Sequence, residues 1–183
     1  MATVLVPLAQ GCEELEAVTI IDLLRRASIE VVTAGLDDEP VKASRGVRLL
    51  PDTTLDKALE QEYDMVVLPG GAVGADNLRN DPRIAELLRK MADSGKWTGA
   101  ICAAPVVLAK AGLLSGKKAT SYPGMLDKLG LEDVEVTADP VVRDGQVVTS
   151  RGPGTAMDFT LELIELLRDR ATRDKVEQAL VRA

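Results

Sequence analysis

Segments with the hydrophobic pattern of strands alternate along the chain with segments that have the pattern of helices. Short apolar runs at 4–8, 29–35, 64–69 and 97–101 are typical of buried strands. Apolar residues at helical spacing follow several of these runs, which predicts helices at 13–27, from Asp81-Pro82 to Met91, from Pro105 to about 111, and after Pro153. A polar segment at 171–181 favours a final helix. This order predicts an α/β fold with a mostly parallel central sheet covered by helices on both faces.

The segment between 117 and 150 has a weaker pattern. It contains strand candidates at 118–121 and 133–136, and residues 141–150 have the pattern of a hairpin with Asp144-Gly145 as its turn. Neither repeats nor linkers interrupt the pattern, so we expect one domain over residues 1–183.

Composition narrows the class of protein. With 29 acidic and 22 basic side chains, the net charge is −7, and only 2% of residues are aromatic. Nucleic-acid binding is therefore disfavoured, because it usually needs a basic face. We also expect no membrane span, since no apolar run is long enough, and the first residues are typical of a strand rather than a signal peptide. A cytoplasmic location is the expectation.

The chain has two cysteines and no histidine. A Cys-His catalytic pair, as in cysteine peptidases, is therefore excluded within the chain. We expect no bound metal and no disulfide framework, because two distant cysteines provide neither.

Cys102 lies where a predicted strand runs into a predicted helix. Its neighbours Ala103 and Ala104 are small, as in the strand-to-helix turn that presents the nucleophile of many hydrolases. The positive end of the following helix predicts a lowered thiol pKa and a reactive thiolate. The alternative is that Cys102 is simply a small buried hydrophobic residue.

Three acids, Glu13, Glu14 and Glu16, begin the first helix. Acids at this position usually complement the helix dipole at the surface, and the spacing does not show which one points inward. A carboxyl held beside a thiolate would have a raised pKa through repulsion and burial. It could then act as a general acid or base near neutral pH.

The pair Gly70-Gly71 follows the strand at 64–69. It is consistent with a plain turn or with a loop whose backbone N–H groups form an oxyanion hole with that of Ala103. Parallel strands bring the loop after Leu8, this glycine pair and Cys102 to one edge of the sheet. Loops at 122–123 and 150–155 are candidates for the rim of the same site. We interpret Cys12 as a loop residue, with a resolving thiol as the alternative.

Four ordered motifs resemble those of the ThiJ/PfpI family, or DJ-1/PfpI superfamily, in the branch of the parkinsonism-associated protein and the bacterial YajL-like proteins. They lie at residues 13–16, 67–71, 100–105 and 149–155 and span nearly the whole chain. The resemblance implies a flavodoxin-like three-layer sandwich, a homodimer and no cofactor.

The resemblance also implies roles for particular residues. Cys102 would be the nucleophile and the oxidation-sensitive thiol, and Glu16 its protonated partner. Backbone groups of Gly71 and Ala103 would be the oxyanion donors, and Arg45 would reach the partner's site across the dimer interface. The rim would comprise Gly70, Tyr122, Arg151 and Pro153. Tyr122 stands where many relatives have a histidine.

The implied activity is glyoxalase III-like: conversion of methylglyoxal, a small ketoaldehyde, to lactate. Repair of glycated proteins, a deglycase activity, and protection against oxidative stress are related activities of the family. The alternative is a redox sensor or chaperone without catalytic activity, whose Cys102 is oxidised to a sulfinate.

Overall fold

The computed structural model describes residues 1–182, in which the main sheet has seven strands. Their order is β10-β11-β7-β6-β1-β2-β5, and every neighbouring pair is parallel except β10 with β11. The strands are β1 (Thr3–Leu8), β2 (Glu30–Gly35), β5 (Thr53–Thr54), β6 (Met65–Leu68), β7 (Trp97–Ile101), β10 (Val141–Asp144) and β11 (Val147–Ser150). The predicted, mostly parallel sheet is confirmed.

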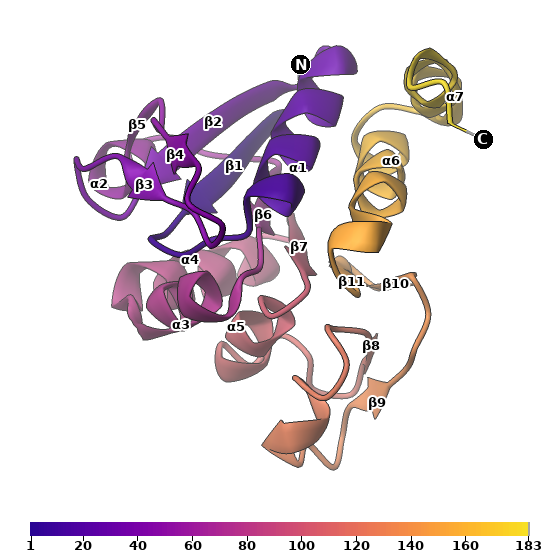
Figure 1. The fold of residues 1–183 in the computed structure, drawn as a ribbon. Helices are drawn as coiled ribbons and strands as arrows, with labels where there is room; N and C mark the ends of the chain where they lie inside the picture. The colour runs from indigo at the N-terminus through magenta and orange to yellow at the C-terminus, as the bar shows by residue number, and fades with distance from the viewer. Residues whose placement is uncertain (183) are drawn as a thin grey trace.

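Helices cover both faces of the sheet. Figure 1 shows α1 and α6 together on one side and α3, α4 and α5 on the other. The helices are α1 (Glu14–Arg26), α2 (Leu55–Ala58), α3 (Ala72–Asn80), α4 (Pro82–Asp93), α5 (Pro105–Lys110), α6 (Ala156–Leu167) and α7 (Arg170–Ala179), with 3-10 turns η1 (Asp127–Leu129) and η2 (Pro153–Thr155). The α/β sandwich with helices on both faces is therefore confirmed.

The core is aliphatic, as expected from the composition. All four residues of β6 are buried, because helices lie on both of its sides. The one phenylalanine, Phe159 of α6, is fully buried and lies against β7 at Gly99. A Cβ on Gly99 would lie 3.2 Å from the Phe159 ring, so this glycine makes room for the ring.

Several predicted details were wrong. The glycine-containing segment after the third strand was not assigned a helix, yet residues 72–80 form α3, which begins after Gly71. The hairpin turn lies one residue later than predicted: Asp144 pairs with Val147, so Gly145 and Gln146 form the loop. Only Gly145 adopts a positive φ there, at 58°.

The segment from 41 to 58 was not assigned any structure from its sequence. It forms the small antiparallel pair β3 (Val41–Lys42) and β4 (Arg48–Leu49), then β5 and α2. Elements of two to four residues are too short to show a period. The remaining small pair, β8 (Lys118–Ala119) with β9 (Glu135–Val136), is parallel and lies within the two predicted segments.

Candidate active site

Cys102 occupies a sharp turn directly after β7. Its φ is 63°, in the left-handed region that non-glycine residues rarely adopt. Two backbone hydrogen bonds hold it there: its N–H donates to Ser150 at 3.0 Å, and its carbonyl accepts from Tyr122 at 2.8 Å. Strained residues of this kind concentrate at functional sites. The predicted strand-to-helix elbow is confirmed in its backbone geometry.

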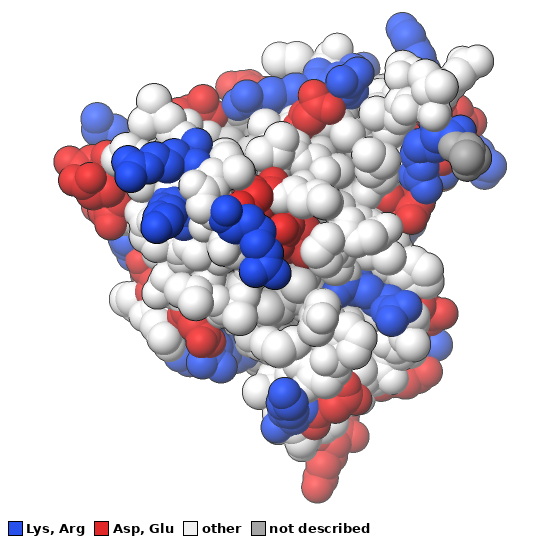
Figure 2. All heavy atoms as spheres, in the orientation of Figure 1, with Lys and Arg blue, Asp and Glu red and all other residues white. Residues whose placement is uncertain are grey.

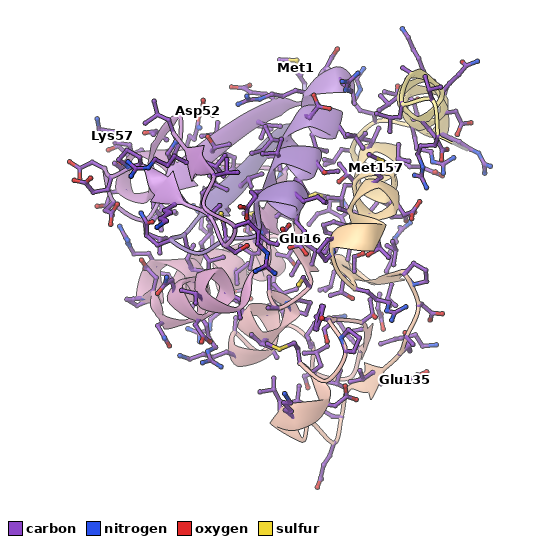
Figure 3. The ribbon with its side chains drawn as sticks, viewed as in Figure 1. Met1, Glu16, Asp52, Lys57, Glu135 and Met157 are labelled. Atoms are coloured by element: carbon purple, nitrogen blue, oxygen red, sulfur yellow. The ribbon has the colours of Figure 1, made fainter. Side chains whose placement is uncertain are left out.

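Glu16 reaches the same place from the first turns of α1. Its side chain is fully buried, and its Oε2 accepts a hydrogen bond from the Gly70 N–H at 2.8 Å. Oε1 is also buried and has no hydrogen-bond partner of ordinary geometry within residues 1–182. Figure 3 shows Glu16 at the end of α1 that faces the middle of the molecule. Apart from its contact with the Cys102 thiol, which acts to lower the pKa of Glu16, this carboxyl therefore keeps one oxygen without a hydrogen-bond partner.

The other two acids of the first helix have structural roles. Glu13 is the N-cap of α1, and its carboxylate accepts the Glu16 N–H at 2.8 Å. Glu14 accepts hydrogen bonds from the Ser44 hydroxyl at 2.9 Å and the Arg45 backbone N–H at 2.7 Å. Of the three acids, Glu16 is the one that points inward.

The glycine pair lets the two functional side chains meet. A Cβ on Gly70 would lie 2.6 Å from both the Cys102 Cβ and the Glu16 Oε2. Gly71 has a φ of 89° and approaches the loop after β1 so closely that a side chain there would clash. Close backbone approach, rather than a plain turn, is therefore what this pair provides.

Burial raises the pKa of Glu16 to about 7, against an ordinary 4.5. Burial, followed by the charge of Glu16, raises the pKa of Cys102 to about 12. The backbone N–H groups of Gly71 and Ala103 approach the sulfur and act in the opposite direction, but they do not outweigh the burial.

The predicted lowering of the Cys102 pKa was therefore wrong. The helix after it is only six residues long and begins at Pro105, with Ala104 as its N-cap. Its dipole is weak, and the thiol is too buried for that dipole to dominate. The prediction of a raised Glu16 pKa agrees with the structure. Together the two groups hold at least one proton at neutral pH.

A depression of about 580 Å³ opens beside Cys102. Of the predicted site residues, Cys102, Gly71, Ala103, Tyr122, Pro153 and Arg45 line it. Arg151 is not among the lining residues, and its backbone N–H donates to the Pro140 carbonyl at 3.4 Å. Sequence reasoning missed Lys42, Ala43, Ser44, Val73 and Met125, which line the same depression.

The missed residues 42–44 come from the β3 segment. Backbone hydrogen bonds tie it to the loop after β1: Gly11 N–H donates to Lys42 at 2.9 Å, and Ser44 N–H donates to Cys12 at 2.8 Å. No local sequence signal shows such long-range pairing.

Among residues 1–182, no group of three or more Cys, Asp or Glu side chains is placed to hold a metal ion. No helix in that range is both long and apolar enough to cross a bilayer.

Comparison with known proteins places the chain in a family. The sequence model of the DJ-1/PfpI family matches residues 2–166. The chain belongs to the DJ-1/PfpI family. "Protein dj-1beta" of Drosophila melanogaster is 46% identical over 175 residues, covering 95% of this chain and 92% of the relative. "Glutathione-independent glyoxalase DJR-1.2" of Caenorhabditis elegans is 37% identical over 166 residues, covering 91% and 88%.

Solved structures agree with this assignment. The crystal structure of Drosophila melanogaster DJ-1beta matches the DJ-1/PfpI chain described here with a TM-score of 0.95 and 44% identity, covering 100% of this chain and 98% of that one. The structure titled "Toxoplasma gondii DJ-1, oxidized" matches with a TM-score of 0.93 and 38% identity, covering 100% of both chains. The family and the flavodoxin-like fold expected from the four motifs are both confirmed.

Proposed function

We propose that this DJ-1/PfpI chain converts small 2-oxoaldehydes, such as methylglyoxal, to 2-hydroxy acids without a cofactor. The observation that carries the proposal is the Glu16 carboxyl: buried, with one free oxygen and a pKa of about 7, beside Cys102. A pKa near the working pH suits a group that must both accept and donate protons. The name of the Caenorhabditis elegans relative supports the substrate class.

The first step is addition of sulfur to the aldehyde. Because the Cys102 thiol has a raised pKa, it loses its proton as it attacks, and the ionised Glu16 accepts that proton. The Cys102 Sγ bonds to the aldehyde carbon as the carbon–oxygen π bond breaks. The carbonyl oxygen then takes the proton from Glu16 and becomes the hydroxyl of a hemithioacetal, which leaves Glu16 ionised again. The backbone N–H groups of Gly71 and Ala103 would stabilise the negative charge that develops on this oxygen.

The second step moves hydrogen between two carbons. A base removes the proton from the former aldehyde carbon, and the neighbouring ketone carbon receives one. The hemithioacetal hydroxyl loses its proton and the ketone oxygen gains one, so the first carbon is oxidised and the second reduced. Glu16 is the group we assign to this transfer. The product is a 2-hydroxy thioester on Cys102, and water cleaves it to the hydroxy acid and the free thiol. The net change is addition of one water, so no external oxidant or reductant is needed.

We also propose that the chain works as a homodimer. The outer face of α1 exposes Leu15 and Val18, and further large apolar side chains are exposed at Val47, Leu50 and Met157. A two-fold contact over such a face would place Arg45, which lines the depression of its own chain, at the interface and near the other copy's site as well. Light scattering at micromolar concentration is expected to give twice the chain mass, and a monomer would rule out the cross-dimer role of Arg45.

The decisive experiment is lactate formation from methylglyoxal by the purified chain, without glutathione. Production by the native chain and its loss in Cys102→Ser are the expected results. Lactate formation that persists in Cys102→Ser would contradict the proposal. The same thiol chemistry would underlie a deglycase activity, which release of lactate from a methylglyoxal-treated peptide would detect.

A second function, redox sensing through Cys102, has its own support. The two backbone N–H groups at the sulfur and the protonated form of Glu16 are donors for the oxygens of a sulfinate. One of the matching structures is titled as oxidised. Absence of lactate formation combined with ready oxidation of Cys102 would favour this function over the enzyme.

A further inference from the structure

Two cationic side chains stand at the edge of the Cys102 depression without an acidic partner. Lys42 and Arg45 both line it, and within residues 1–182 neither forms an ion pair. Their backbones are held in place by hydrogen bonds: Lys42 N–H donates to Gln10 at 2.9 Å, and Arg45 N–H donates to Glu14 at 2.7 Å. Figure 2 shows basic side chains gathered over the β3 and β4 region beside an acidic patch.

The acids of this region do not neutralise the two cations. Glu13, the one carboxylate that lines the depression, caps α1. Glu14 is engaged by the Ser44 hydroxyl and a backbone N–H. Lys42 also lies directly opposite Arg48 in the β3–β4 pair, and like charges in that position are destabilising. Positive charge is thus concentrated at this edge without an ion pair among the described residues.

The depression is also large for the simplest substrate. Its volume of about 580 Å³ exceeds what a three-carbon ketoaldehyde fills, and Ala43, Val73 and Met125 provide apolar parts of its wall. The space therefore fits a substrate with a further group beyond its reactive carbonyls.

We infer that the preferred substrates are anionic 2-oxoaldehydes, whose reactive end reaches Cys102 while a distal carboxylate or phosphate binds Lys42 and Arg45. This inference rests on the proposed function and specifies its substrate class. The chemistry is the same at the reacting carbons: the aldehyde carbon is oxidised to a carboxylate, the ketone carbon is reduced to an alcohol, and one water is consumed. The distal anion takes no part in bond making.

The test compares 4,5-dioxopentanoate with its methyl ester, which has the same reactive end and no distal charge. We expect the native chain to turn over the acid with a kcat/KM about tenfold higher than the ester, the size expected of two exposed charge contacts acting together. Lys42→Glu should bring this ratio to about one, and Lys42→Gln should give an intermediate value. The preference should also weaken with added salt.

Lys57→Glu is the matched control. Lys57 is exposed on α2, forms no ion pair within the described residues and does not line the depression. Figure 3 shows it at the far edge of the molecule from Glu16. The same charge reversal there should leave the acid-to-ester ratio as in the native chain. Equal turnover of both probes, or a ratio that Lys42→Glu does not change, would overturn the inference.

A second measurement separates this inference from the proposed function. The acid's expected product, 2-hydroxyglutarate, can be titrated calorimetrically onto Cys102→Ala, which cannot react. Binding that Lys42→Glu weakens about tenfold supports the anion subsite even if no probe is turned over. Turnover of both probes without any product binding or charge preference contradicts the subsite while leaving the enzyme function intact.

Discussion

The two cysteines of this chain are alike in the properties that usually identify a reactive thiol. Both are buried, with 8% of Cys102 and 1% of Cys12 exposed, and burial raises the pKa of each to about 12. Neither is a stable thiolate at neutral pH. If thiol pKa decided function, the two sites would be equivalent.

Their surroundings differ in what can take the proton and what can reach the sulfur. Cys102 has the free oxygen of Glu16, two approaching N–H groups and an open depression. Around Cys12 the carboxylates of Glu14 and Glu13 only raise the pKa further. Helix α3 also closes over it: a Cβ on Gly74 would lie 2.6 Å from the Cys12 Cα. Access and a matched proton acceptor, rather than resting pKa, distinguish the candidate catalytic thiol.

The largest expected difference between the two sites is in catalysis. Cys102→Ser should lower lactate formation by about 10³-fold or more, because a serine hydroxyl is far harder to ionise and Glu16 is too weak a base for it. Cys12→Ser should keep a rate close to that of the native chain. Steady-state rates of both variants with methylglyoxal test this, and a Cys12→Ser loss as large as that of Cys102→Ser would remove the distinction.

Glu16→Gln should reduce kcat/KM by about 10², the usual cost of losing general acid–base help. In the native chain the rate should rise with pH through about 7. The reactive state is the Cys102 thiol beside an ionised Glu16, so the two groups together hold one proton in place of two. Glu16→Gln should lose this rising limb. A native profile that is flat from about pH 5 to about 9, roughly two units on either side of the Glu16 pKa, would show that Glu16 is not the proton acceptor.

The pH dependence of the free energy of unfolding should reveal the raised pKa of the Glu16 carboxyl without any measurement of turnover. The folded pKa of Glu16 is about 7 and its ordinary value is 4.5, so the folded state binds the proton more tightly. The stability from this group is therefore fully present below pH 4.5 and is lost as pH rises to 7. Denaturant titrations should show native stability falling relative to Glu16→Gln by about 3 kcal/mol over that window. Parallel curves for the two proteins would contradict the raised pKa.

Sequence patterns predicted the sheet, the main helices and the Cys102 elbow because each depends on local periodicity or on one junction. They did not show which acid faces the thiol, since Glu13 and Glu16 are three residues apart and only the capping contact of Glu13 separates their roles. They also missed Lys42, because its place at the site depends on backbone pairing with the distant loop after β1. The direction of the thiol pKa was wrong for a related reason: burial is set by tertiary packing.

Oxidation is the smallest expected difference and the one that tests the comparison most directly. Since the two thiols have similar pKa values, thiolate fraction alone predicts equal reaction with peroxide. If access and a nearby proton acceptor decide instead, the Cys102 peptide should gain the mass of two oxygen atoms about tenfold faster than the Cys12 peptide gains any.

The Glu16 variants separate the two causes. Glu16→Gln keeps a hydrogen-bond donor for a sulfinate but removes the acceptor of the thiol proton, so oxidation of Cys102 should slow while the sulfinate, once formed, persists. Glu16→Asp moves the carboxyl back by one methylene, which should weaken the donor contact and let more of Cys102 proceed to sulfonate. Peptide mass spectrometry after mild peroxide treatment resolves both outcomes. Oxidation of Cys12 first, or at an equal rate, would mean that the open depression and Glu16 do not govern thiol reactivity in this fold.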